Sequence, residues 1–375
     1  MQSLDFLREC CNPDAVIFFQ VRVDHVRFRV TRLLDPALFS AMRGWPFLRT
    51  MAVALACTMF LSLPAMAGPG SDFTIVALPD TQFYSASYPK IAAAQVNWIV
   101  ANRKDLNIVY VAHLGDVTDQ GDEKPEQWAN AADALYRLED PAATGLPSGI
   151  PYGVVPGNHD HVGGTSRFNK YFGAGHFSGR SYYGGHYGKD NNSHFDLFTA
   201  GSLDFIVLYI DFNFDKPDYA SIDAWADVVL KAHAGRRAIV VSHDLLAVDG
   251  SFDPRGQAIY DKLKSHPNLF LMLCGHNHGE ARRFNTHDGR TVIVCLSDYQ
   301  SWPEGGGGYL RLYRFSPAEN LVRVQTFSPW TEKFKTDPAS QFEFGCRMDP
   351  GPLAGLGTPH PGASVVPGQA APGNP

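Results

Sequence analysis

The chain has 375 residues, of which 45% are hydrophobic and 19% are charged. This length and apolar content are sufficient for the core of one large domain or of two smaller ones. The formal net charge of -6 gives the chain no general basic surface for nucleic acid. Any chemistry on phosphate groups would therefore need local positive charge, such as metal ions.

The segment 42–67 has the pattern of a secretory signal peptide. It has a basic start, an apolar run over 51–63 and an Ala-x-Ala cleavage site that ends at Ala67. The apolar run is too short to span a bilayer. We therefore expect a secreted or periplasmic protein without a membrane span after cleavage. Residues 1–41 would then be a mis-assigned start or a disordered leader, with Met42 as the alternative first residue.

The region 72–335 is expected to form the folded domain, because apolar strand-like runs alternate there with helical patterns. Strands are predicted over 73–78, 108–112, 150–155, 193–199, 203–210, 237–241 and 269–274. Helices are predicted over 91–103, 126–139, 221–233 and 257–265, and an antiparallel group over 290–296, 308–315 and 321–326. Residues 161–192 have no clear period and predict a long loop over the site. The Pro/Gly-rich segment 336–375 predicts a disordered tail.

Polar clusters follow the predicted strands. These clusters are Asp80 with Gln82, Asp116 with Asp119, Asn158 with His159, His243 alone, and His276 with His278. Any one of them is also typical of a solvated turn, but their recurrence after independently predicted strands indicates a common site. Carboxylate, imidazole and amide groups are ligands of divalent metals, and one carboxylate can bridge two ions. Asp116 is the natural bridge.

These motifs resemble those of the calcineurin-like metallophosphoesterase superfamily, which are D-x-H, GD-x-x-D, GNH[DE], a single H and GH-x-H in that order. The resemblance implies an α/β fold, namely a two-sheet β-sandwich flanked by helices in four layers, α/β/β/α. It also implies a dinuclear metal centre. The implied ligands of the first ion are Asp80, Gln82, Asp116 and His278, and those of the second are Asp116, Asn158, His243 and His276. His159 resembles the family's acid near the leaving group, oriented by Asp119.

Gln82 is the one departure, because the common motif has histidine at that position. An amide oxygen is a weaker and harder ligand than imidazole. Among manganese, iron and zinc, we therefore expect manganese or iron to be favoured at the first site, with a lower affinity.

The function implied is hydrolysis of a phosphomonoester or phosphodiester by a hydroxide that two divalent metal ions activate. The alternatives are a non-catalytic binding protein on the same fold, or a nuclease. A small-molecule substrate is favoured over a protein, because Gln120 stands where the protein Ser/Thr phosphatases of the superfamily have arginine. Nucleic acid is not an expected partner.

Candidates for substrate contact are His161, Arg167 and Arg180, although a solvated loop role is the favoured interpretation for each of them. Aromatic residues in the same region could stack on a base or sugar, or could pack beneath the loop. Asp298-Tyr299-Gln300 could line the rim of the pocket, without an assigned role. Cys274 and Cys295 each end an apolar run and could be buried thiols or one disulfide bridge.

Overall fold

The computed structural model describes the following residues: 70–212 and 219–348 in full, and the secondary structure of 19–23 and 26–30. The chain divides into two compact units, Met1–Met66 and Ala67–Pro375. None of the helices in the described part of the chain is long and apolar enough to cross a membrane.

In the first unit, strands β1 (Phe19–Val23) and β2 (Val26–Val30) form an antiparallel pair. The rest of the expected leader 1–41 and the whole expected signal peptide 42–67 lie outside the described residues.

The second unit contains two sheets. The first has seven strands in the order β15-β14-β13-β3-β4-β5, with β16 also paired to β14. Its strands are β3 (Phe73–Leu78), β4 (Ile108–His113), β5 (Tyr152–Val154), β13 (Leu310–Ser316), β14 (Leu321–Ser328), β15 (Lys333–Lys335) and β16 (Gln341–Gly345). Strands β3, β4 and β5 are parallel, as helical crossovers require, and the other pairings are antiparallel.

The second sheet also has seven strands, in the order β11-β12-β10-β9-β8-β7-β6. They are β6 (Tyr183–His186), β7 (His194–Ala200), β8 (Leu203–Ile210), β9 (Arg237–Ser242), β10 (Leu269–Cys274), β11 (Gly279–His287) and β12 (Arg290–Asp298). Strands β8, β9, β10 and β12 are parallel. The antiparallel expectation for 290–296 was therefore wrong for its pairing with β10 and correct for its pairing with β11.

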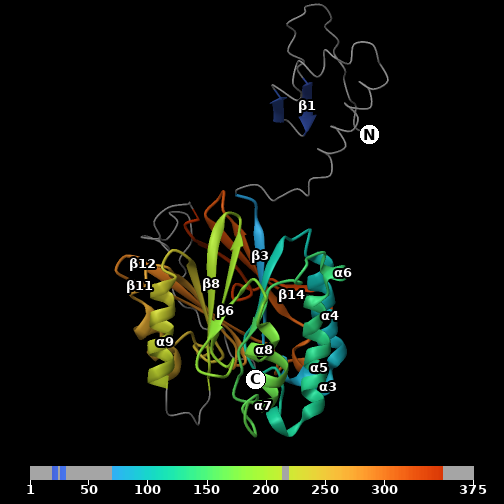
Figure 1. Ribbon diagram of the computed structural model, residues 1–375, viewed down its shortest axis with the longest axis vertical. Helices are drawn as coiled ribbons and strands as arrows, with labels where there is room; N and C mark the ends of the chain where they lie inside the picture. The colour runs from blue at the N-terminus through green and yellow to red at the C-terminus, as the bar shows by residue number, and fades with distance from the viewer. Residues whose placement is uncertain (1–18, 24–25, 31–69, 213–218, 349–375) are drawn as a thin grey trace, which may run out of the picture. The chain divides into compact units, whose positions relative to one another are not determined.

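Helices cover the outer face of each sheet (Figure 1). The helices are α3 (Gln82–Ser87), α4 (Pro89–Asn102), α5 (Pro125–Leu135), α6 (Pro141–Thr144), α7 (Ser166–Phe172), α8 (Ala174–Phe177), α9 (Tyr219–Ala232), α10 (Pro254–Leu263) and α11 (Pro303–Gly306), with 3-10 turns η1 (Gly121–Glu123) and η2 (Tyr136–Glu139). Apolar faces of α4 and α5 pack on the first sheet, and those of α9 and α10 pack on the second. In α9 this face is Ile222, Ala226 and Val229, at helical spacing.

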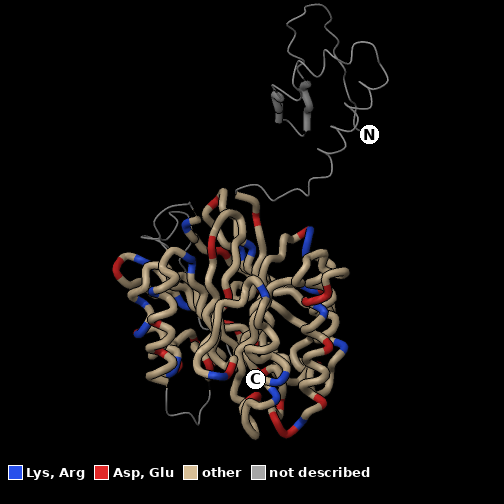
Figure 2. The backbone as a smooth tube through the Cα atoms, viewed as in Figure 1, with Lys and Arg blue, Asp and Glu red and all other residues tan. Residues whose placement is uncertain are grey.

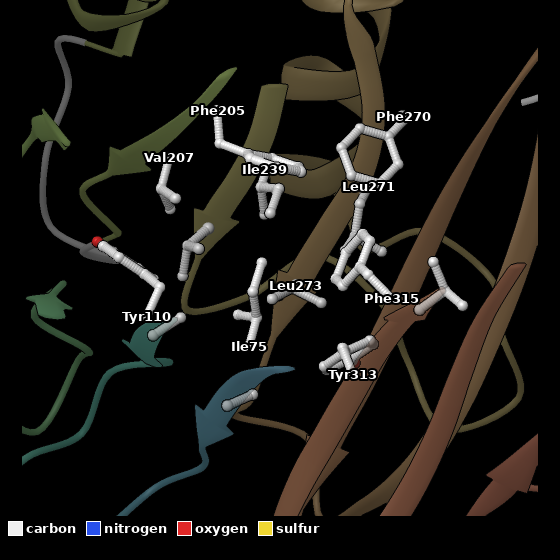
Figure 3. Close-up of a cluster of buried hydrophobic side chains, with 14 of the residues drawn as sticks. Ile75, Tyr110, Phe205, Val207, Ile239, Phe270, Leu271, Leu273, Tyr313 and Phe315 are labelled. Carbon is white, nitrogen blue, oxygen red and sulfur yellow. The ribbon is translucent and has the colours of Figure 1, made fainter. Parts of the chain in front are cut away.

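The inner faces of the two sheets form the central core (Figure 3). Ile75 and Tyr313 come from the first sheet, and Phe205, Ile239 and Leu271 come from the second. This core and the two outer helical layers confirm the expected four-layer α/β/β/α sandwich.

Two expected boundaries were wrong. The predicted loop 161–192 contains α7, α8 and β6, because Phe168 and Phe172 share one face of α7 and pack against Trp128. The predicted tail 336–375 begins too early, since β16 pairs with β14 and Phe344 is buried in the central core. Residues 349–375 lie outside the described residues.

Cys274, Cys295 and Cys346 are buried free thiols in the described chain. The Cys274 thiol donates to the carbonyl oxygen of Cys295 at 3.7 Å. Of the two interpretations of Cys274 and Cys295, the structure therefore supports buried thiols.

Candidate metal centre

The residues expected to bind metal follow the carboxyl ends of five strands, β3, β4, β5, β9 and β10. The loops after these strands are joined across the two sheets. The backbone N–H of His276 donates to Oδ2 of Asp80 at 3.1 Å, and Nε2 of His243 lies 3.2 Å from Oδ2 of Asp116. The fold therefore brings the ends of both parallel groups to one place.

Asp116, His243 and His276 form the centre of this place. Each offers one ligand atom, and the three atoms lie within 4.8 Å of one another. Asp116 and His276 have positive φ angles of 48° and 69°. Such a backbone conformation is uncommon outside glycine and often marks a functional turn.

One ring nitrogen of His243 is held by a backbone carbonyl, an arrangement common in histidines that bind metal. Its Nδ1–H donates to the carbonyl oxygen of Leu114 at 3.0 Å, which leaves Nε2 directed at Asp116. Nε2 and Oδ2 of Asp116 are close enough for an ion pair, but both lack a hydrogen-bond partner in the described chain. A cation between them would satisfy both atoms.

Several other ligand atoms in the site are buried without a hydrogen-bond partner among the described residues. They are Oδ1 of Asp80, Oε1 of Gln82 and Oδ1 of Asn158. A buried polar atom left unpaired costs about 1–3 kcal/mol. The residues present therefore fit a divalent metal, which would coordinate these oxygens.

Electrostatics give the same indication. Burial and the neighbouring Asp298 carboxylate raise the pKa of Asp80 well above its usual range. Burial disfavours the charged form of His243, but the carboxylates of Asp116 and Asp80 outweigh it and raise the pKa of His243 to about 10. Both shifts arise because several carboxylates are buried close together at this site.

His278, the remaining expected ligand, lies at the exposed side of the site. Its Nε2 accepts a hydrogen bond from the side-chain amide of Gln300 at 2.8 Å. A metal ion at His278 would need a ring nitrogen with an available lone pair.

Asp160 connects the second and third motifs beneath the ligands. Its fully buried carboxylate accepts from the backbone N–H groups of Val117, Thr118 and Gly157 at 2.8–3.0 Å. Asp160 belongs to the third motif, but its positioning role could not be predicted from the sequence.

His113 was not predicted from the sequence to belong to the site. The backbone N–H of Gly115 donates to Nδ1 of His113 at 3.2 Å, so Nε2 carries the proton and donates to Oγ1 of Thr81 at 2.9 Å. Burial and the nearby His243 lower the pKa of His113 to about 3. His113 is therefore a neutral link between the loops after β3 and β4.

Two glycines of the motifs, Gly157 and Gly275, lie so close to carboxylates of the site that no side chain fits there. A Cβ at Gly157 would lie 2.2 Å from Oδ1 of Asp116, and a Cβ at Gly275 would lie 2.1 Å from Oδ1 of Asp80. Any side chain at these positions would displace a carboxylate of the site.

His159 lies at the mouth of the site, with its side chain 37% exposed. Its Nδ1–H donates to the backbone carbonyl of Asp119 at 2.8 Å, and Oδ1 of Asp119 is 3.4 Å away. The expected pairing of these residues is present, with the carbonyl as the nearer partner. Nε2 of His159 is the nitrogen left for proton exchange.

The three candidates for gripping substrate have different surroundings. His161 lies 2.8 Å from Asp211, which follows β8. The Nε–H of Arg167 donates to the carbonyl of Asp122 at 2.8 Å, and Arg180 forms an ion pair with Glu139 at 2.8 Å. Of these three, His161 alone belongs to the loop that also carries His159.

The aromatic residues of this region pack rather than line an open surface. Phe172 and Tyr182 are buried in the core beneath the first sheet's helices, and Tyr171 stacks on Trp128 with ring centroids 6.4 Å apart. The packing interpretation of these residues is therefore supported.

The family model for calcineurin-like phosphoesterases matches residues 73–280. The chain belongs to this family. Membership, together with the fitting ligand set, supports metal-dependent hydrolysis of phosphoesters in general terms.

One curated relative is the "Uncharacterized protein YvnB" of Bacillus subtilis (strain 168), which is 39% identical over 297 residues. The match covers 75% of this chain but only 22% of that protein, so the chain spans about a fifth of the relative's length.

Among solved structures, a dimetal phosphatase from Danio rerio is similar with a TM-score of 0.46 and 15% identity, over 68% of this chain and 96% of that one. The calcineurin-like phosphoesterase YfkN from Bacillus subtilis has a TM-score of 0.39 and 16% identity, over 73% and 88% of the two chains.

Proposed function

We propose that the chain hydrolyses phosphoesters of small molecules at a site that holds two divalent metal ions. The observation that carries this proposal is a set of buried ligand atoms that have no hydrogen-bond partner among the described residues, in Asp80, Gln82, Asp116, Asn158 and His243. These atoms come from loops of both sheets and have no other evident purpose. Asp116 is the residue that two ions would share, because a carboxylate has two oxygens.

The first ion would be held by Asp80, Gln82, Asp116 and His278, and the second by Asp116, Asn158, His243 and His276. When bound, such ions neutralise phosphoryl oxygens and lower the pKa of a water so that hydroxide forms near neutral pH. The amide oxygen of Gln82 supports manganese or iron over zinc at the first position.

His159 supplies the proton for the leaving group in this proposal. The carbonyl of Asp119 fixes the ring through Nδ1, so Nε2 delivers the proton to the departing oxygen. General acid catalysis of this kind contributes about two to four orders of magnitude.

Two features support a small molecule as the substrate. Gln120 is exposed beside Asp119 and cannot grip a phosphate as arginine does. Lys and Arg are interspersed with Asp and Glu over the described domain in the view of Figure 2, which does not favour nucleic acid. Of the three candidates for substrate contact, His161 is the one in the loop of His159, where its ring is paired with Asp211.

The signal-peptide pattern of 42–67 supports a secreted or periplasmic location for this activity. Sequencing the amino terminus of the protein exported by its host cell tests this location. We expect the exported chain to begin at Gly68.

Hydrolysis of two chromogenic esters tests the function. Metal-stripped protein is given manganese, iron, nickel or zinc and assayed with p-nitrophenyl phosphate and bis(p-nitrophenyl) phosphate. We expect metal-restored release of p-nitrophenol, and the ratio of the two rates identifies a monoesterase or a diesterase. A folded protein that is inactive with every metal would favour a non-catalytic binding protein.

A further inference from the structure

Two buried polar atoms near the site are not explained by the ligands considered so far. They are Oδ2 of Asp298 and Oε1 of Gln300, and neither has a hydrogen-bond partner among the described residues. Asp298 is fully buried, and Gln300 is 5% exposed. Buried oxygens of this kind are rarely left without a partner.

Strand pairing places Asp298 beside the last metal-binding motif. It is the final residue of β12 and lies opposite Gly279, the residue after His278, in the pairing with β11. On its other side β12 runs parallel to β10, with Leu296 opposite Cys274. Asp298 thus lies at the same end of the sheet as the loop that carries His276 and His278.

The charges around Asp298 are those of the first metal site. Its carboxylate is the neighbouring charge that contributes most to raising the pKa of Asp80. Burial raises the pKa of Asp298 to about 6, and His278 and His243 oppose this rise. Asp80 and Asp298 are both buried, and each has one carboxylate oxygen without a hydrogen-bond partner among the described residues.

Gln300 connects Asp298 to His278. Its backbone N–H donates to Oδ1 of Asp298 at 2.9 Å, and its side-chain amide donates to Nε2 of His278 at 2.8 Å. The first contact fixes the Asp298 carboxylate and leaves Oδ2 available. The second contact ties the ring of His278 to the segment that carries Asp298.

We propose that Asp298 is a further ligand of the first metal ion, through Oδ2, and that it compensates for the weak amide ligand Gln82. This inference rests on the proposed two-metal function, to which it adds one ligand. A carboxylate is a hard anionic ligand and suits manganese or iron, the metals that Gln82 also favours.

Metal binding tests the inference without an activity assay. Titration of metal-stripped protein with manganese chloride is followed by isothermal calorimetry, for wild type, Asp298→Asn and a control, Asp196→Asn. Asp196 is also buried and has one oxygen without a hydrogen-bond partner among the described residues, but its other oxygen accepts a hydrogen bond from the hydroxyl of Tyr110 on β4. We expect two sites in wild type and in the control, and about 10–100-fold weaker binding at one site in Asp298→Asn, as metal-site substitutions commonly cause.

Combined variants identify which ion is affected. Asp298→Asn with Gln82→Ala should weaken one site further and leave the other unchanged. Asp298→Asn with Asn158→Ala should weaken both sites. If Asp298→Asn combined with Gln82→Ala lowers the metal affinity of both sites, Asp298 belongs to the second ion and the proposal is contradicted.

The unfolding midpoint of the metal-free protein separates a ligand from a structural residue. A ligand carboxylate repels its neighbours when no ion is present, so Asp298→Asn should melt no lower than wild type without metal and gain less on adding manganese. Asp298→Ser serves as a second variant if the asparagine variant does not fold. A lower metal-free midpoint with unchanged manganese affinity would overturn the proposal.

The outcomes also separate this inference from the proposed function. Wild type that binds manganese and hydrolyses esters, with Asp298→Asn equal to it in affinity, would overturn the inference alone. Wild type that binds two ions in an Asp298-dependent way but hydrolyses no ester would support the ligand and contradict the function. Wild type that binds no metal would overturn both.

Discussion

Asp160 holds Thr118 by two hydrogen bonds to the same carboxylate oxygen. Oδ1 of Asp160 accepts from the backbone N–H of Thr118 at 2.8 Å and from its hydroxyl at 2.9 Å. Oδ2 of Asp160 accepts two further backbone N–H groups, those of Val117 and Gly157. One buried carboxylate thus joins the loop after β4 to the loop after β5, next to Asp116 and Asn158.

Asp160→Asn should therefore destabilise the fold and weaken metal binding together. The asparagine amide has one oxygen where Asp160 has two, and the two oxygens of Asp160 accept from four donors. Two of these donors therefore lose their acceptor in either orientation of the amide. Each buried unpaired donor costs about 1–3 kcal/mol, and we expect a loss of about 2–5 kcal/mol in unfolding free energy. Urea unfolding measures this loss. Asp133→Asn, at an acid whose side chain is 74% exposed, is the control and should change stability by less than about 1 kcal/mol.

Gly115→Ala should disturb His243 and lower the affinity of the second ion. A Cβ at Gly115 would lie 2.4 Å from Nδ1 of His243, and the φ of Gly115 is +102°, which strains any other residue. The strain alone amounts to about 1–3 kcal/mol. Manganese titration and thermal unfolding measure both effects. Gly235→Ala, where a Cβ meets no atom within 4 Å, should behave as wild type; equal behaviour of the two alanine variants would contradict the packing described.

Gln82→His should restore the common first motif and change the metal preference. An imidazole nitrogen binds zinc better than an amide oxygen does. We expect zinc affinity at the first site to rise by about tenfold or more, within the range by which metal-site substitutions act. Competition between zinc and manganese, followed by metal analysis of the dialysed protein, measures the change. Unchanged metal content and affinity would show that Gln82 is not a ligand.

His159→Ala should leave metal binding intact and slow turnover by about 10²–10⁴-fold, the usual contribution of a general acid. The loss should be larger for an alkyl phosphate ester than for a p-nitrophenyl ester, because p-nitrophenolate leaves without protonation. Rates with both esters at saturating manganese measure the difference. An equal loss with both would contradict proton donation by His159.

The sequence was sufficient to predict the main strands of the sandwich and the gathering of its ligand motifs. Runs such as Phe73–Leu78 are buried along their whole length, so their apolar pattern is continuous and easily recognised. Because parallel strands present their carboxyl ends at one edge, the residues after β3, β4 and β5 had to lie close together.

Other elements depend on contacts that a local pattern does not contain. Strand β11 is an edge strand in which Arg282 and Arg283 are adjacent and no apolar residues alternate along one face, so it was not predicted. Strand β16 is short, and only its pairing with β14 distinguishes it from a tail. Asp298 was expected at the rim of the pocket, but its burial beside the last motif follows from strand register. The position of His113 follows from burial and contacts that the sequence does not state.

Asp116 would connect two metal ions in a phosphoester hydrolase, and measurements on Asp116→Asn test this claim. The variant is compared with wild type and with Asp196→Asn, for manganese content and for hydrolysis of the two p-nitrophenyl esters. We predict that Asp116→Asn folds, retains less than the full complement of manganese and hydrolyses either ester at below about a hundredth of the wild-type rate, because the loss of one preorganised charge costs about 10²–10³-fold in rate. Asp196→Asn should keep both metal and activity. Wild-type activity and metal content in Asp116→Asn would contradict the claim.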